Sequence, residues 1–207
     1  MIIGFDIDGI LTQDGCEVEN YNNNNKKIWK YFLEDYLGKK LERQNNSYNF
    51  AKAYGFPTKE MIKFFEEEMS NIIPKFKVNQ EIKYIINKLY EDGNTIYLIT
   101  ARDNKKEIKN ATIKWLKDNN IKYHEIYFLK EKGQKAKELG IEWFFEDHIK
   151  NAEDLQKNNI KVFMLGKYHN QPKDHKNHPA LIFKNNSKEM VNAFFNLYKH
   201  KKQKIAY

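Results

Sequence analysis

The stretch FDIDGILT, residues 5–12, places two acidic side chains directly after an apolar segment. Residues 1–5 are apolar enough to form a buried strand, and a carboxylate at the end of such a strand is costly unless it is paired, hydrogen-bonded or bound to a metal. Asp6 and Asp8 therefore need a chemical explanation, and the rest of the sequence supplies one.

The composition is that of a globular protein. The chain has 207 residues, of which 41% are hydrophobic and 14% aromatic, so it can bury a full core and is not expected to be disordered. The length suits one domain with an insertion.

Cellular location and partners follow from simple features. No basic leader precedes the first strand and no apolar run approaches 18 residues, which predicts a cytoplasmic protein without a membrane partner. The single cysteine, Cys16, cannot form an internal disulfide, as is typical of a reducing compartment. The net charge of +8 comes from lysines spread along the whole chain, and the basic residues 200–204 suit a solvated helix end. We therefore expect no nucleic-acid partner, and the oligomeric state stays open.

From residue 79 onward, helical and strand patterns alternate. The helix that begins at Asn79 and ends at Gly93 is followed by the apolar strand TIYLIT at residues 95–100. Further strands are expected at residues 123–129, 142–146, 161–165 and 180–183, and further helices near residues 104–119, 131–139, 149–158 and from Ser187. Regular alternation predicts an α/β protein with a Rossmann-like parallel sheet, which also includes the first strand at residues 2–6.

The segment between the first strand and residue 79 has a different character. Helical periodicity appears at residues 26–37 and 58–73, and the second helix is predicted to have Thr58 as its N-cap and to stop at Pro74. We expect no strand in this segment. It is therefore predicted to form a small helical cap inserted after the first strand. The predicted domains are an α/β core of residues 1–13 and 79–207 and a cap of residues 14–78.

Polar side chains follow three strands of the predicted sheet. Asp6 and Asp8 follow the first strand, Thr100 ends TIYLIT, and Glu146 and Asp147 end the strand at residues 142–146. Ligands of parallel sheets bind beyond the carboxyl ends of the strands, so we expect these groups to meet. Three or more carboxylates without a local basic partner would suit a hard divalent cation such as Mg²⁺.

Three motifs resemble those of the haloacid dehalogenase superfamily phosphatases. DIDGILT at residues 6–12 resembles the first motif, LITAR at 98–102 the second, and FFEDHIKNAEDL at 144–155 the acidic fourth. Within the superfamily, residues 98–121, 132–155 and 161–171 most resemble nucleotidases of the 5'(3')-deoxyribonucleotidase type. The resemblance implies a haloacid dehalogenase-like fold and a hydrolase of phosphoric monoesters.

The resemblance also implies roles for the two acids of the first motif and for the metal. Asp6 would be the nucleophile that forms an aspartyl-phosphate, and Asp8 would be the general acid and base. Mg²⁺ would be held by Asp6, the backbone carbonyl of Asp8, and Asp147.

A phosphate cradle is implied by the second motif and by a lysine. Thr100 and the amide of Ala101 would bind phosphoryl oxygens, and a cation would complete the cradle. Lys132 is preferred for this role, but Lys135 lies one turn further along the same helical face and stays an alternative.

The substrate is expected to be a small phosphomonoester, and a nucleotide is favoured. Aromatic side chains of the cap could stack on a base, and the candidates are Trp29, Phe32, Tyr36 and Phe65. Two alternatives stay open at this point: a sugar-phosphate phosphatase of the same superfamily, and a catalytically silent member that binds nucleotides or a protein.

Overall fold

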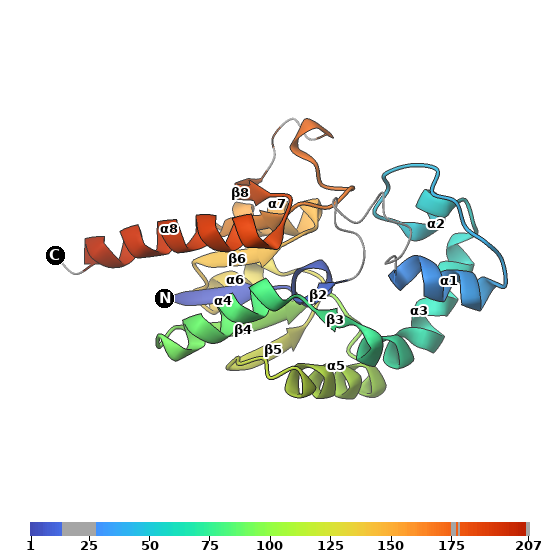
Figure 1. Cartoon of the computed structure of the whole chain (residues 1–207), viewed down its shortest axis with the longest axis horizontal. Coiled ribbons are helices and arrows are strands. Elements are labelled where there is room, and N and C mark those ends of the chain that lie inside the picture. Colours follow the sequence, from blue (N-terminus) through green and yellow to red (C-terminus); the bar gives the residue numbers. More distant parts are fainter. Residues whose placement is uncertain (14–27, 175–176, 178, 206–207) are drawn as a thin grey trace.

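The computed structural model describes residues 1–13, 28–174, 177 and 179–205, and its centre is a six-stranded parallel sheet (Figure 1). Cys16 lies outside the described residues. The strands are β1 (Ile2–Phe5), β4 (Thr95–Thr100), β5 (Glu125–Phe128), β6 (Trp143–Glu146), β7 (Lys161–Leu165) and β8 (Ala180–Lys184), in the order β5-β4-β1-β6-β7-β8 across the sheet. β1 is central and pairs in parallel with β4 and with β6, so the turn after β1 lies between two other strand ends.

Helices cover both faces of this sheet. Helices α4 (Gln80–Glu91), α5 (Lys106–Asp118) and α8 (Ser187–Ile205) supply buried residues to the larger hydrophobic cluster. Helices α6 (Gly133–Glu138) and α7 (Ile149–Lys157) supply residues to a second cluster on the opposite face. No helix within the residues that the structure describes is long and apolar enough to span a bilayer. The predicted α/β fold with a parallel sheet is confirmed.

β1 shows why the sheet is packed tightly at its centre. Ile3 and Phe5 are fully buried in the larger cluster, and the Phe5 ring stacks on that of Phe145 at 4.5 Å between centroids. Gly4 faces the other cluster, where an added Cβ would lie 2.3 Å from the Phe144 ring. A side chain at residue 4 would therefore force β1 away from β6, and with it the polar residues that follow the two strands.

The insertion between β1 and α4 has helices in its described part, as predicted. It contains α1 (Ile28–Leu37), α2 (Phe50–Tyr54) and α3 (Thr58–Ile72). In Figure 1 these helices lie to the right of the sheet, which is the side toward which β1 runs from the N-terminus. Trp29 of α1 is the centre of their packing, with its ring 5.4 Å from Phe65 and 5.0 Å from Phe76. The helices therefore stand at the end of the sheet where the carboxyl ends of the strands lie.

The expectation that this segment contains no strand is wrong. β2 (Thr12–Gln13) and β3 (Lys77–Val78) form an antiparallel pair where the chain leaves and re-enters the core. Two residues are too few to show the alternation by which a strand is recognised in a sequence, and these strands form only because the fold brings two distant segments together.

Two helix details also differ from expectation. Pro57, not Thr58, occupies the N-cap position of α3, and no side chain caps this helix. The short helix α2 was not expected; Asn49 caps it by accepting a hydrogen bond from the Lys52 amide at 3.0 Å. By contrast, Asn79 caps α4 as predicted, since its side chain accepts from the Ile82 amide at 3.3 Å.

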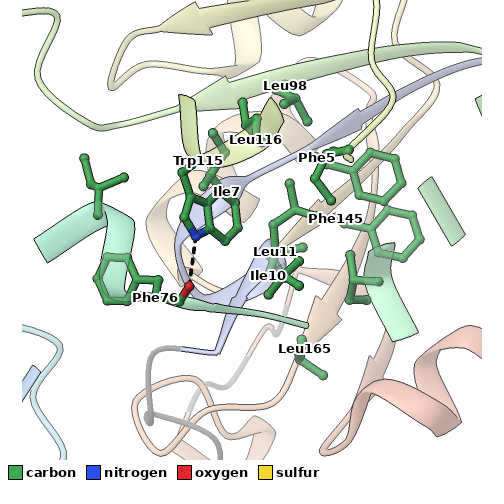
Figure 2. Close-up of a cluster of buried hydrophobic side chains, with 14 of the residues drawn as sticks. Phe5, Ile7, Ile10, Leu11, Phe76, Leu98, Trp115, Leu116, Phe145 and Leu165 are labelled. Carbon is green, nitrogen blue, oxygen red and sulfur yellow. Dashed lines mark hydrogen bonds between the residues drawn. The ribbon is translucent and has the colours of Figure 1, made fainter. Parts of the chain in front are cut away.

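The return from the insertion is fixed to the core by one buried hydrogen bond. After α3, a 3-10 turn at Ile73–Lys75 leads to Phe76, whose carbonyl accepts a hydrogen bond of 2.9 Å from Nε1 of Trp115. Figure 2 shows this bond within the hydrophobic cluster of the core. Trp115 lies on α5 and is 2% exposed. Helix α5 therefore sets where the chain passes from α3 into β3.

Replacing Trp115 with Phe should lower the free energy of unfolding by about 2–3 kcal/mol, because the buried Phe76 carbonyl loses its donor and the smaller ring leaves space. Urea denaturation followed by circular dichroism measures the loss. Ile113→Ala is the matched control on the same helix: Ile113 is 44% exposed, and the change should stay within about 0.5 kcal/mol. A Trp115→Phe loss no larger than that of the control would contradict the anchoring role of the bond.

Candidate active site

The turn after β1 carries the two acids of the first motif. Asp6 is 6% exposed, and its Oδ1 accepts a hydrogen bond of 2.7 Å from the Ile7 amide. Gly9 has a φ of +77°, which disfavours any residue with a side chain. A Cβ at this position would also lie 2.1 Å from Oδ2 of Asp147. Gly9 therefore lets the turn after β1 lie directly against the acid that follows β6.

Three buried carboxylates meet at this point. Asp6, Glu146 and Asp147 each offer one oxygen, and these oxygens all lie within 4.8 Å of one another. Carboxylate oxygens converging from neighbouring strand ends are the donors that a hard divalent cation prefers. The donor set therefore fits Mg²⁺; the Asp8 side chain is not part of this cluster, and its backbone carbonyl stays a predicted ligand.

Lys132 lies inside the acidic cluster. Its Nζ is 2.9 Å from Oδ2 of Asp6 and 2.7 Å from Oε2 of Glu146, and its side chain is fully buried. Lys135, the alternative, has a side chain that is 31% exposed and pairs with Glu138 at 3.6 Å. The structure thus brings Lys132 to Asp6 and places Lys135 on the surface of α6.

The expectation of an acidic cluster without a local basic partner is wrong. Lys132 pairs with Asp6, and the guanidinium of Arg102 pairs with Asp8. Neither cation is near the first motif in the sequence, so local inspection of charge could not find these pairs. They form because the β1 turn, the end of β4 and the start of α6 converge.

Burial and charge shift the pKa values of this cluster in opposite directions. Burial raises the pKa of Asp6 well above its usual value; Lys132 opposes the rise and Glu146 adds to it. Burial alone would raise the pKa of Glu146 too, but Lys132 and hydrogen bonds to the carboxylate bring it below its usual value. Burial would lower the pKa of Lys132, yet the two carboxylates raise it. Lys132 and Glu146 therefore form the ion pair, and a bound cation would stabilise the ionised form of Asp6, which burial disfavours.

The adjacent acids Glu146 and Asp147 have different surroundings. Besides Lys132, Glu146 Oε1 accepts from the amides of Asp147 at 3.2 Å and His148 at 3.1 Å, and from Nδ2 of Asn151 at 3.2 Å. Its carboxylate is thus engaged in holding the end of β6 and the start of α7. Asp147 instead lies against the backbone of Gly9.

The second motif ends β4 next to the β1 turn. Thr100 is fully buried, and its Oγ1 accepts from the Arg102 amide at 3.3 Å. Ala101 follows directly after the strand. Because Leu98 pairs with Phe5 in the sheet, Thr100 and Ala101 lie beside the turn that carries the first motif. The predicted phosphate-binding residues are therefore at the predicted edge.

Arg102 is a site residue that the sequence analysis did not single out. Its Nε and Nη2 hold the two oxygens of Asp8 at 2.8 and 2.6 Å, in the two-point geometry typical of an arginine–carboxylate pair. Its Nη1 donates to Oγ1 of Thr112 on α5 at 3.0 Å. The side chain is 1% exposed, so Arg102 fixes the orientation of Asp8. The available signal was its place as the last residue of the second motif, LITAR.

The segment after β7 also reaches the site. Nδ2 of Asn170 donates to the carbonyls of Asp147 at 2.6 Å and Leu165 at 2.9 Å, which joins the segment to the end of β6. Nε2 of His169 is 3.9 Å from Oδ2 of Asp147. Burial lowers the pKa of His169 to about 3, so its ring is neutral at pH 7. The sequence resemblance of this segment was noted, but its contact with the acidic pair was not foreseen.

Aromatic residues of the insertion divide into packing residues and one that reaches the site. Trp29 is buried, the hydroxyl of Tyr36 donates to Glu67 at 2.7 Å, and Phe32 and Phe65 pack partly buried against the hydrophobic cluster, so all four base-stacking candidates contribute to the packing of the insertion. Tyr48 was not among the candidates, yet its ring lies 4.1 Å from that of His148, the residue after Asp147.

Comparison with known proteins is consistent with this geometry. No family model matches the chain. A curated nucleotidase of Clostridium acetobutylicum is 26% identical over 171 residues, which is 82% of this chain and 82% of the relative.

Solved structures share the fold at low sequence identity. A haloacid dehalogenase-like hydrolase of Streptococcus pneumoniae has a TM-score of 0.62 at 13% identity and covers 93% of this chain and 97% of its own. A structure described as a predicted phosphatase of C. acetobutylicum has a TM-score of 0.62 at 16% identity, over 94% and 98%. A haloacid dehalogenase family hydrolase of Deinococcus radiodurans with bound phosphate and sodium has a TM-score of 0.61 at 13% identity, over 93% and 94%. Fold and sequence together confirm the predicted resemblance to the haloacid dehalogenase-like hydrolases and to a nucleotidase.

Proposed function

We propose that the protein is a magnesium-dependent phosphomonoesterase that hydrolyses nucleoside or deoxynucleoside monophosphates through an aspartyl-phosphate. The observation that carries the proposal is the cluster of Asp6, Lys132 and Asp147 at the carboxyl ends of the central strands. The similarity to a curated nucleotidase supports the class of reaction and favours a nucleotide as substrate.

Asp6 is the nucleophile of the proposed reaction. One of its oxygens attacks phosphorus, the bond from phosphorus to the leaving oxygen breaks, and Asp8 gives that oxygen its proton. Water then attacks the aspartyl-phosphate, Asp8 takes the proton of the water, and Asp6 and inorganic phosphate are released. Arg102 orients Asp8 at the edge of the site, where 30% of its side chain stays exposed; the first step uses the protonated form of Asp8 and the second its carboxylate, the form that the pair with Arg102 favours.

The cation and the cradle act on the phosphoryl group. Mg²⁺ held by Asp6, Asp147 and the Asp8 carbonyl would screen the repulsion between nucleophile and phosphate. Thr100 and the Ala101 amide donate to phosphoryl oxygens, and Lys132 adds positive charge beside the attacking carboxylate. The bound phosphate and sodium in the D. radiodurans hydrolase support a place for an anion and a cation in this fold.

The helical insertion acts as the cap of the proposed enzyme. In this proposal, core residues 1–13 and 79–207 carry the chemistry, and residues 14–78 form the cap, whose helices α1, α2 and α3 would cover the strand ends. Such a cover excludes water and large substrates, which favours small phosphomonoesters over phosphoproteins.

The substrate class is tested with a panel of nucleotides, sugar phosphates and p-nitrophenyl phosphate, each with Mg²⁺ and then with a chelator. We expect nucleotides to exceed sugar phosphates in kcat/KM by about tenfold or more, because base stacking on an aromatic side chain contributes about 1–3 kcal/mol. Chelation should abolish every activity, and added Mg²⁺ should restore it. A sugar phosphate with a higher kcat/KM than every nucleotide would contradict the nucleotide assignment, while the assignment as a phosphatase would stand.

Replacing Asp6 with Asn should lower turnover by about a thousandfold or more, because an amide does not attack phosphorus. Steady-state kinetics with p-nitrophenyl phosphate measures the loss, and circular dichroism checks that the variant is folded. Turnover within tenfold of the wild type would rule out the covalent mechanism.

The two acids after β6 should respond differently to neutralisation. Asp147→Asn should raise the Mg²⁺ concentration at half-maximal activity by about tenfold or more, with little change in melting temperature, since it removes a charged donor. Glu146→Gln should instead lower the melting temperature by about 6–12 °C, corresponding to about 3 kcal/mol for a weakened buried ion pair with Lys132. Each variant controls the other, and equal effects on Mg²⁺ dependence would show that the wrong acid is assigned to the metal.

A further inference from the structure

The loop between α1 and α2 is held against the core by Arg43. Nη1 of Arg43 donates to the carbonyls of Asn45 at 2.9 Å and Ser47 at 3.3 Å, which fixes the shape of the loop. The same guanidinium lies over the ring of Tyr168, 3.5 Å from its centroid. One arginine therefore both orders the end of this loop and joins it to the segment after β7, close to the acidic cluster.

The side chain of Tyr48, the next residue of the loop, packs against the rings of two histidines close to Asp147. Its ring centroid is 4.1 Å from that of His148 and 4.9 Å from that of His169. His148 follows Asp147 in the chain, and Nε2 of His169 is 3.9 Å from the Asp147 carboxylate. The insertion thus places one aromatic side chain at the acid proposed to hold the metal.

The hydroxyl of Tyr48 is a protonated group in the electrostatic field of the acidic cluster. Burial raises its pKa well above the usual value, and nearby carboxylates raise it further, in the order Asp147, Asp6, Asp8 and Glu146. The residue as a whole is 54% exposed, so part of Tyr48 is open to solvent. The hydroxyl therefore keeps its proton, and it donates no hydrogen bond to any residue that the structure describes.

We propose that the Tyr48 hydroxyl donates a hydrogen bond to the phosphoryl group of the substrate, completing from the insertion a cradle whose other donors lie on the core. The inference rests on the proposed function, since it takes the phosphoryl group to bind between Asp6 and the cradle. It assigns to the loop between α1 and α2 a direct part in substrate binding. The four carboxylates make an anion costly here, and the bound cation together with an added neutral donor offsets that cost.

A purely structural role for Tyr48 predicts a different result from the same variant. If only the ring matters, through its contacts with His148 and His169, then Phe at position 48 keeps those contacts and nothing changes. If the hydroxyl binds phosphate, the same replacement removes one donor and leaves the packing intact. Tyr48→Phe is therefore the informative change, and Tyr31→Phe is the matched control, because Tyr31 lies on α1 and is 66% exposed.

The experiment measures hydrolysis of p-nitrophenyl phosphate and, by calorimetry with Mg²⁺ present, the Kd of inorganic phosphate. We expect Tyr48→Phe to lower kcat/KM and weaken phosphate binding by about tenfold, the usual size of a hydrogen bond to a charged group, without a change in melting temperature. Tyr31→Phe should match the wild type in all three measurements.

The outcomes separate this inference from the proposed function. An active wild type with a Tyr48→Phe variant within twofold of it in both kcat/KM and Kd overturns the role of Tyr48 and leaves the phosphatase standing. A wild type that hydrolyses no ester but binds phosphate more tightly than Tyr48→Phe supports the binding role and overturns the function. A wild type that neither hydrolyses esters nor binds phosphate overturns both.

Discussion

The buried ammonium of Lys132 between Asp6 and Glu146 is the interaction on which the rest of the site depends. Burying an unpaired charge costs several kcal/mol, so each of these groups is tolerable only while its partners are in place. The three come from the end of β1, the end of β6 and the residue before α6. Sheet order, the close contact of β1 with β6, and the position of α6 must therefore all be correct together.

Around this pair, the protein keeps more negative than positive charge at the strand ends. Asp147 lies against Gly9, where a glycine with positive φ lets a carboxylate approach the backbone. Asp8 is turned away from the cluster and held by Arg102. Neighbouring acids thus have different environments, Asp6 beside Lys132, Asp8 beside Arg102 and Asp147 beside Gly9, so the acids of two motifs can have different chemistry.

The insertion contacts the core at two places, one at Phe76 and one at Arg43. The Phe76 carbonyl is held by Trp115 of α5, the helix whose Thr112 also supports Arg102. On the other side, Arg43 lies over Tyr168 and places its loop at the acidic pair. Helix α5 therefore links the path of the insertion to the orientation of Asp8. A change in the packing of α5 at Phe76 would also shift the Arg102 side chain that holds Asp8.

The sequence by itself determined the parallel α/β core, the helical character of the insertion and the acids of the first motif, because periodicity and short motifs are local properties. It also placed Thr100 and Asp147 at strand ends, and parallel strands bring their carboxyl ends to one edge. Only the tertiary structure showed that Lys132, and not Lys135, lies against Asp6, since both share a helical face and differ only in what lies opposite. It alone paired Arg102 with Asp8, formed the two-residue strands β2 and β3, and brought Tyr48 to the site, because these contacts join segments whose separation leaves no pattern in the sequence.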